Sequence, residues 1–186
     1  MPLDRIKETY RRHTVLAARH EGQLKGRVFK DRQVVHECEG TSIDEILVML
    51  KEFIDVSLYE AAENRQSPPD GEEYVRAFKK IQTGLTNAQC AMLKAHYRAD
   101  GQTLTATELA KAAGYATYSA ANLQYGMVGY NLNEELPIKL ETRANGTPIA
   151  TFALATAGEQ KGSELHWAWK LRPEVAYAIE KLGLHT

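Results

Sequence analysis

The second half of the chain takes its fold from the stretch Thr105-Ala-Thr-Glu-Leu-Ala-Lys-Ala-Ala-Gly-Tyr-Ala-Thr-Tyr-Ser-Ala-Ala-Asn-Leu-Gln-Tyr-Gly-Met-Val-Gly-Tyr130. Thr105 and Glu108 form a capping box, which predicts that a helix occupies residues 106–113. Gly114 is typical of the left-handed residue that ends such a helix. A longer helix is expected from Tyr118 or Ser119 to about residue 135. These proportions indicate a helix-turn-helix at residues 105–134, an element that lays its second helix in a groove.

Beyond Pro137 the apolar spacing changes from helical to alternating, which is typical of strands. Asn145-Gly146 is a strong signal for a hairpin turn. Arg172-Pro173 opens a closing helix, which Gly183 ends. The expected strands are Ile138–Arg143, Ile149–Ala155 and Glu164–Leu171, the last with Leu165, Trp167, Trp169 and Leu171 on one face. We therefore expect residues 71–186 to be a winged-helix-like domain, with Glu159–Gly162 as the tip of the wing.

Upstream of the helix-turn-helix, the pattern predicts two more helices, at 72–83 and from the Thr86/Gln89 capping box to about Arg98. The Pro/Gly-rich segment 66–71 marks a boundary, so that residues 1–66 form a separate first part. That part is expected to contain a short helix near residues 3–12, a small sheet and a long helix of about 22 residues. The strands of this sheet are Thr14–His20, Gln23–Phe29 and Gln33–Glu37, and Ser42 with Glu45 starts the long helix. The expected fold class is α+β.

The formal net charge of −1 conceals two blocks of opposite sign. Residues 1–36 contain nine basic and four acidic residues, a net charge of +5. Residues 37–75 contain eleven acidic and two basic residues, a net charge of −9. Such blocks are typical of a basic face for an anionic partner beside an acidic face, or of two surfaces that face each other. The sequence leaves both interpretations open.

The sequence contains no motif for catalysis, metal binding or a cofactor, so we expect a protein that is not an enzyme. The six histidines are scattered, and neither a P-loop, a G-x-S-x-G motif nor a dinucleotide fingerprint occurs. Cys38 and Cys90 lie far apart and are expected to be reduced thiols. No apolar run is long enough to span a membrane, and the N-terminus lacks a signal-peptide core. A cytoplasmic location is therefore expected.

The predicted helix 118–134 carries the residues that suit DNA recognition. Asn122 and Gln124 have amides of the kind that pair with adenine in the major groove, or else are solvated surface amides. Tyr118, Ser119 and Tyr130 can bond phosphates. Two glycines on one stripe, Gly126 and Gly129, indicate a close approach by a neighbouring helix or a nucleic-acid backbone, or a kink at Gly126. The helix has no Lys or Arg, so cations must come from elsewhere: Lys111, Lys139, Arg143, Lys161 or the first 36 residues.

Parts of the second half resemble a module that accompanies the nuclease in some HNH-type, modification-dependent restriction endonucleases. The resemblance covers about residues 85–183 and lies in the runs Leu85–Gln89, Leu104–Tyr115, Ser119–Gly129 and Trp167–Gly183. It implies a role in DNA recognition for the residues Tyr118, Ser119, Asn122, Gln124, Tyr125 and Gly126. The chain departs from those enzymes because it has no HNH nuclease motif, so nuclease activity is not implied.

The leading hypothesis is a non-enzymatic protein that binds double-stranded DNA, linked to restriction or to phage–host defence. Asn122 and Gln124 would contact bases, Tyr118 and Ser119 phosphates, and Lys161 the backbone from the wing. The alternative is a protein–protein adaptor or inhibitor that docks a partner through helix 42–64 or through the Gly126/Gly129 stripe. A nuclease subunit without an active site is a third interpretation, and a homodimer is a further possibility. No membrane partner, metal or cofactor is expected.

Overall fold

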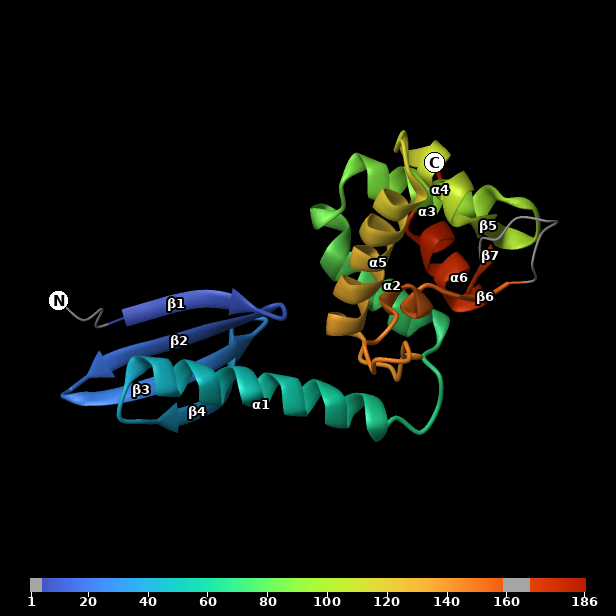
Figure 1. The fold of residues 1–186 in the computed structure, drawn as a ribbon. Coiled ribbons are helices and arrows are strands. Elements are labelled where there is room, and N and C mark those ends of the chain that lie inside the picture. The colour runs from blue at the N-terminus through green and yellow to red at the C-terminus, as the bar shows by residue number, and fades with distance from the viewer. Residues whose placement is uncertain (1–4, 159–167) are drawn as a thin grey trace. The chain divides into compact units, whose positions relative to one another are not determined.

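The structure is a computed structural model, and it describes residues 5–158 and 168–186. Its fold belongs to the α+β class, with a four-stranded sheet, a three-stranded sheet and six α-helices among the described residues (Figure 1). The chain divides into two compact units, Met1–Asn64 (unit 1) and Arg65–Thr186 (unit 2). Each unit encloses its own cluster of buried apolar side chains.

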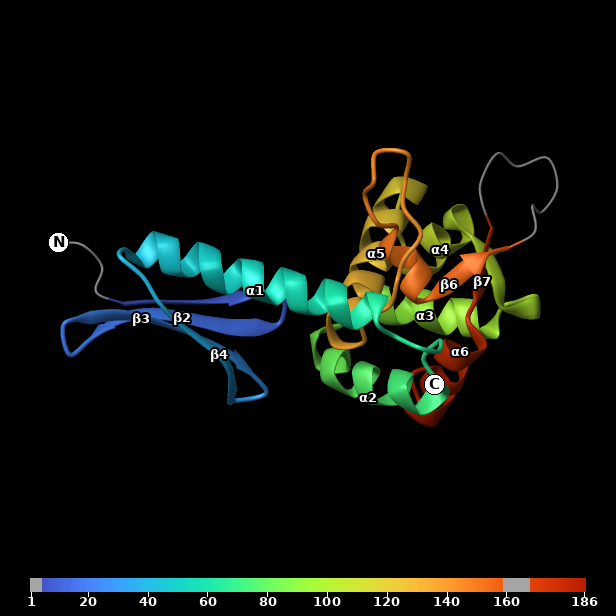
Figure 2. The same ribbon diagram turned by 90° about the horizontal axis from the view of Figure 1, so that it is seen from below.

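Unit 1 is an antiparallel meander of four strands with one long helix across one of its faces (Figure 2). In all three two-residue turns both residues have positive φ, as type I′ turns require. Helix α1 approaches the sheet closely at Gly26, where an added Cβ would lie 2.3 Å from Ile46. The elements are β1 (Arg5–Tyr10), β2 (His13–His20), β3 (Gln23–Lys30), β4 (Gln33–Glu39) and α1 (Ile43–Glu63), and the buried core is Val15, Ala17, Val28, Ile46, Leu50 and Ile54.

The first strand corrects the expectation of a helix near residues 3–12. Ile6 and Tyr10 stand four residues apart, a spacing that also suits a helix, but the side chains of 5–10 alternate between exposed and half-buried. Every residue of β1 pairs with β2, from Arg5 opposite Ala18 to Tyr10 opposite His13. Pairing with β2 outweighs the helical tendency of this segment, because a helix of so few residues is only marginally stable.

Helix α1 begins as predicted at the Ser42 N-cap, whose side chain accepts a hydrogen bond from the Glu45 backbone N–H at 3.1 Å. The reciprocal half of the expected box is shifted by one residue. Glu45 accepts instead from the backbone N–H of Thr41 at 2.7 Å and from the Thr41 hydroxyl at 2.6 Å. These hydrogen bonds lower the pKa of Glu45, and the bond from the Thr41 hydroxyl contributes most.

In the described part of unit 2, five α-helices, three 3-10 helices and three short strands pack around one core. Capping boxes start the second, third and fourth helices, at Asp70, Thr86 and Thr105, and Gly114 ends α4 in the left-handed conformation at φ 72°. The three strands pair antiparallel in the order β5-β7-β6. The elements are α2 (Gly71–Ile81), η1 (Gln82–Gly84), α3 (Asn87–Arg98), η2 (Asp100–Gln102), β5 (Thr103–Thr105), α4 (Ala106–Ala113), α5 (Tyr118–Glu135), η3 (Ala150–Ala153), β6 (Ala155–Ala157), β7 (Ala168–Leu171) and α6 (Pro173–Lys181).

Two of the expected strands, Ile138–Arg143 and Ile149–Ala155, do not form as predicted. Residues 138–143 are extended only in part, with a single bridge between Thr142 and Pro148, and residues 150–153 form the 3-10 helix η3. The turn at Asn145-Gly146 is present, with the Gly146 N–H donating to the Arg143 carbonyl at 2.8 Å. The bridge is flanked by hydrogen bonds from the Arg143 N–H to the Thr147 carbonyl at 2.9 Å and from the Ile149 N–H to the Glu141 carbonyl at 2.8 Å.

The last strand also differs in length from the expectation. Within the described residues β7 covers Ala168–Leu171, with Trp169 half-buried and Leu171 buried on one face as expected. Its partner β5 was not expected, because three residues are too few for an alternating pattern. Trp167 and the wing tip at Glu159–Gly162, with Lys161, lie outside the described residues.

Candidate nucleic-acid interface

Helix α5 forms one wall of the candidate site, and its buried stripe fixes its orientation. The Thr117 hydroxyl caps its start by accepting a hydrogen bond from the Ala120 N–H. One side of the helix faces the core through residues that are at most 1% exposed: Ala121, Tyr125, Val128 and Leu132. The opposite side, which carries Leu123, Met127 and Tyr130, therefore faces away from the core.

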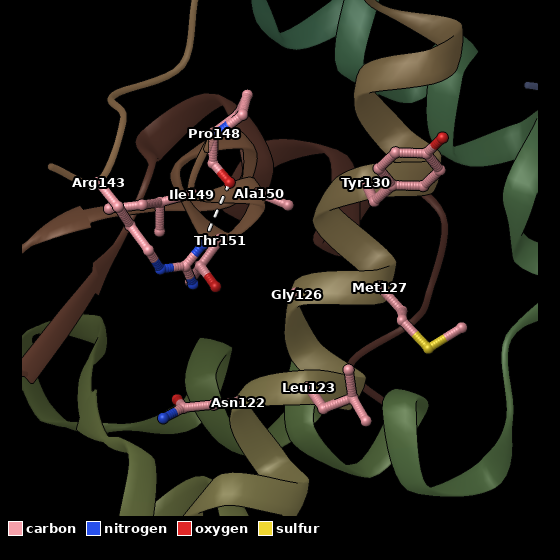
Figure 3. Close-up of a pocket in the computed structure, with 10 residues that line it drawn as sticks. All are labelled: Asn122, Leu123, Gly126, Met127, Tyr130, Arg143, Pro148, Ile149, Ala150 and Thr151. Carbon is pink, nitrogen blue, oxygen red and sulfur yellow. Dashed lines mark hydrogen bonds between the residues drawn. The ribbon is translucent and has the colours of Figure 1, made fainter. Parts of the chain in front are cut away.

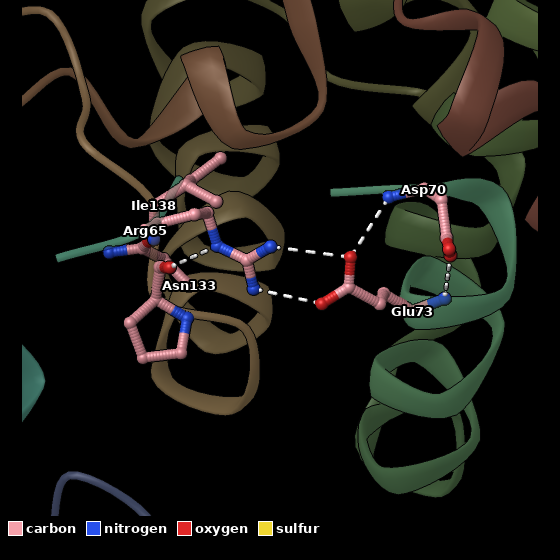
Figure 4. Close-up of polar contacts among 6 residues, drawn as sticks. Arg65, Asp70, Glu73, Asn133 and Ile138 are labelled. Carbon is pink, nitrogen blue, oxygen red and sulfur yellow. Dashed lines mark hydrogen bonds and ion pairs between the residues drawn. The ribbon is translucent and has the colours of Figure 1, made fainter. Parts of the chain in front are cut away.

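The far end of α5 is held by polar contacts in unit 2 (Figure 4). The Asn133 side-chain oxygen accepts from the Ile138 N–H at 2.9 Å, which fixes the turn after the helix. Arg65 donates to the Pro137 carbonyl at 3.3 Å and to both carboxylate oxygens of Glu73 at 3.2 and 2.9 Å. The hydrogen bond from Arg65 is the main cause that lowers the pKa of Glu73. These contacts tie the turn after α5 to the start of unit 2.

The glycine stripe of α5 accommodates a segment of the same chain. A Cβ at Gly129 would lie 2.1 Å from the carbonyl oxygen of Ala150, so the backbone of η3 packs directly on this glycine. Of the three explanations that the sequence left open, a neighbouring helix accounts for Gly129. At Gly126 the nearest atom is the Thr151 hydroxyl at 3.9 Å, which leaves space above the helix.

That space is a groove of about 350 Å³ between α5 and the segment before and within η3 (Figure 3). Asn122 and Gly126 form part of one wall. Arg143, whose guanidinium donates to the Pro148 carbonyl at 3.5 Å, belongs to the facing wall. The complete lining is Asn122, Leu123, Gly126, Met127, Tyr130, Arg143, Pro148, Ile149, Ala150 and Thr151.

The residues expected to contact DNA differ in how exposed they are. Tyr118, Ser119 and Asn122 are exposed near the start of α5. Gln124 is half-buried, and its side-chain oxygen accepts a hydrogen bond from the Gln89 amide at 3.2 Å. Because the side-chain oxygen of Gln124 is bonded to Gln89, Gln124 joins α3 to α5 instead of standing free on the surface.

The expectation that Tyr125 contacts DNA is wrong, because its side chain lies in the core, 1% exposed, and is closed to any ligand. Its hydroxyl lies 2.7 Å from Nδ1 of the buried His96, whose Nε2 lies 2.8 Å from the Trp169 carbonyl oxygen. A carbonyl only accepts, so Nε2 carries the proton and Nδ1 accepts from Tyr125. Burial lowers the pKa of His96 and raises that of Tyr125, so both groups are neutral at pH 7.

The groove also contains residues that sequence reasoning missed. Leu123, Met127 and Tyr130 recur at four- and three-residue steps along the exposed side of α5, with 64%, 46% and 48% of their surfaces exposed. Tyr130 was expected only as a phosphate ligand, and Arg143 only as one of several cations. The spacing of the three side chains is visible in the sequence. Their exposure depends on which side of α5 packs against the core, and the fold determines this.

No family model matches the chain, and no curated protein or solved structure is significantly similar to it. The resemblance to the module of HNH-type endonucleases therefore stays a prediction. Within residues 5–158 and 168–186, no group of three or more His, Cys, Asp or Glu side chains is placed to hold a metal ion. None of the helices in those ranges is long and apolar enough to cross a membrane.

Proposed function

We propose that this protein binds double-stranded DNA and places the first half of α5 in the major groove. The order of elements in unit 2 supports the proposal: α3, β5, α4, α5, β6 and β7, with the sheet order β5-β7-β6. A helix, a first strand, a helix-turn-helix and two further strands are the parts of a winged helix, in which the second helix of the pair reads DNA.

The observation that carries the proposal is the groove that Asn122 and Arg143 line together from opposite walls. An asparagine amide can bond adenine bidentately, and a guanidinium can bond guanine or a phosphate. Tyr118 and Ser119, exposed in the first turn of α5, would bond phosphates on either side. Gln124 and Tyr125 leave the set of expected contacts because the interior engages both.

Charge sets the strength of this contact. Helix α5 has neither Lys nor Arg, and Arg143 is the one cation among the described residues that line the groove. Few phosphate contacts imply modest affinity and a shallow dependence on salt for unit 2 by itself. The recognition role implied by the endonuclease resemblance fits such a module, which would act in restriction or phage defence in the cytoplasm without cleaving DNA.

The test is a binding selection from random duplexes with the full chain. Asn122→Ala should remove preference at one base pair, worth about 1–3 kcal/mol of discrimination. Arg143→Gln should weaken binding to all duplexes and lower the slope of log K against log salt by about 1. Lys181→Gln, an exposed cation on α6 away from the groove lining, is the control with the same change of charge. Unchanged preference in Asn122→Ala would rule out α5 as the reader.

A protein partner is the second candidate, favoured by the exposed apolar stripe Leu123, Met127 and Tyr130. Exposed apolar groups also lie on α1, at Val48, Val56 and Tyr59, whereas Gly129 is already covered by η3. An adaptor that docks through such side chains would bind its partner with little dependence on salt. Titration at two salt concentrations therefore separates the two functions: binding that persists unchanged at high salt favours the adaptor.

A further inference from the structure

The four-stranded sheet of unit 1 has one face that α1 does not cover. Val15, Val28 and the other core residues of the strands point toward α1, so the alternate positions point away. The pairing register aligns these outward residues in rows across the sheet. We call this surface the open face; its rows are Arg5–Ala18–Lys25–Glu39, Lys7–Leu16–Arg27–Glu37 and Thr9–Thr14–Phe29–Val34.

Cations dominate the open face. Among the described residues of the sheet it holds four cations, Arg5, Lys7, Lys25 and Arg27, and two carboxylates, Glu37 and Glu39. The cations form two columns on β1 and β3. Strand geometry spaces them by about 7 Å within a column and about 10 Å between columns. The result is a small positive field on this face of the sheet.

The helix side of unit 1 has the opposite charge. The exposed acids of α1 include Asp44, Glu45, Glu52, Glu60 and Glu63, and none of its exposed residues is a cation. Four cations of the basic block thus lie on the open face, and the exposed acids of α1 lie on the opposite side of the sheet. A unit polarised in this way turns its positive side toward a polyanion and its negative side away from it.

The two acids at the β4 edge reduce the field but do not cancel it. Glu37 lies 2.6 Å from Arg27, and Glu39 lies 3.3 Å from Lys25, with side chains of all four residues between 41% and 64% exposed. Ion pairs that are so accessible to water are weak, so an incoming phosphate can compete for both cations. Arg5 and Lys7 are exposed on the far edge strand.

From this arrangement we infer that the open face of β1–β4 is a second DNA-binding surface, which contacts the phosphate backbone of a duplex without reading bases. It goes beyond the α5 interface because it belongs to the other unit and stands on different residues. Leu16 and Phe29 lie among the cations and supply apolar contact to sugars, while the threonines of the third row can donate to phosphates. Duplex DNA matches the charge of this face, because its phosphates present a dense and regular array of negative charge.

The test measures fluorescence anisotropy of a labelled random-sequence 20-base-pair DNA duplex with the full chain over a salt series. The double variant Arg5→Gln/Lys7→Gln should lower the slope of log K against log salt by about 2 and weaken binding about tenfold at low salt. The double variant Glu37→Gln/Glu39→Gln should bind more tightly, a gain that misfolding cannot produce. The control Glu52→Gln/Glu60→Gln makes the same change in net charge on α1 and should change binding far less.

The outcomes separate this surface from the α5 proposal. Loss of cations from the open face should weaken binding to all duplexes equally, and it should do so in the Asn122→Ala background as well. The variants of α5 should instead alter sequence preference. Equal gains from the Glu37/Glu39 and Glu52/Glu60 variants would overturn the inference, because binding would then follow total charge. Tighter binding of an RNA hairpin or of an acidic polypeptide to the same face would overturn it as well.

Discussion

The ionisation of His96 is linked to the fold of unit 2. None of its surface is exposed, and both ring nitrogens are engaged, by the Tyr125 hydroxyl and by the Trp169 carbonyl. A second proton would take from Nδ1 its ability to accept the Tyr125 hydrogen bond. Burial and this geometry both favour the neutral ring, in agreement with the lowered pKa.

Unit 2 should therefore lose stability when the pH falls below the pKa of an unfolded histidine, about 6.5. The unfolded chain takes up the proton at a higher pH than the folded one, so the free energy of unfolding decreases until the pH passes the folded pKa. His96→Gln should be less stable at pH 7.5, and its deficit relative to the wild type should shrink toward pH 5. Urea unfolding over this range measures the difference; a deficit that stays constant would contradict the linkage.

Gly129 and Gly126 form a matched pair for testing the packing of η3. A methyl group at Gly129 would meet the Ala150 carbonyl at 2.1 Å, a backbone atom that cannot rotate away. Gly129→Ala should thus cost about 1–3 kcal/mol of stability. Gly126→Ala should instead stabilise by up to about 1 kcal/mol, because alanine favours a helix and the nearest atom is 3.9 Å away. Thermal denaturation of both variants checks the pair, and equal effects would contradict the close packing of η3 on Gly129.

At the scale of elements, the helices were predictable because their ends are encoded locally. The boxes Thr86/Gln89 and Thr105/Glu108 are both fully formed, and α4 and α5 begin and end where the pattern indicated. The strands and η3 were less predictable. β1 needs β2 as a partner, β5 needs β7, and η3 forms where an extended segment was expected, packed on Gly129. Such elements depend on long-range pairing, which a local pattern does not record.

The cap of α5 offers a test that separates helix stability from DNA contact. Thr117→Ala removes the hydroxyl that accepts from Ala120 and should cost about 0.5–2 kcal/mol. Thr117→Asp should restore the cap and complement the helix dipole, but its negative charge beside Tyr118 and Ser119 should repel phosphates. We expect near-wild-type urea stability with weakened DNA binding for the aspartate, and wild-type behaviour for Thr117→Ser. Full DNA affinity in a stable Thr117→Asp protein would argue against contact at this end of α5.

At the scale of the whole molecule, the candidate site was only partly visible in the sequence. Asn122 and Ser119 were expected on the surface and are exposed. The groove itself required Arg143 to lie across from Asn122, a juxtaposition of residues from α5 and the following hairpin that only the fold creates. The same holds for the open face: the sequence contained a basic block, and the register of four strands arranges four of its cations on one side.

The division into two units predicts that their contributions to binding can be separated. Unit 2 buries a large cluster that includes Tyr74, Phe78, Met92 and Leu109, whereas the core cluster in the described part of unit 1 has six buried apolar side chains. Residues 65–186 should therefore fold alone with a cooperative urea transition, because a chain of this size can bury enough apolar surface. Residues 1–64 should be only marginally stable, since so short a domain buries a smaller fraction of its surface.

DNA binding by the fragment 65–186 follows from the two surfaces. It should keep the base preference of the full chain, because α5 and the groove lie within it. It should also show a shallower salt dependence, with a slope smaller by about 2 or more, because the cations of the open face are absent. A selection experiment and a salt titration on the same fragment measure the two quantities separately. An unchanged slope would place all phosphate contacts in unit 2, whereas a lost preference in a folded fragment would make unit 1 part of the base-reading surface.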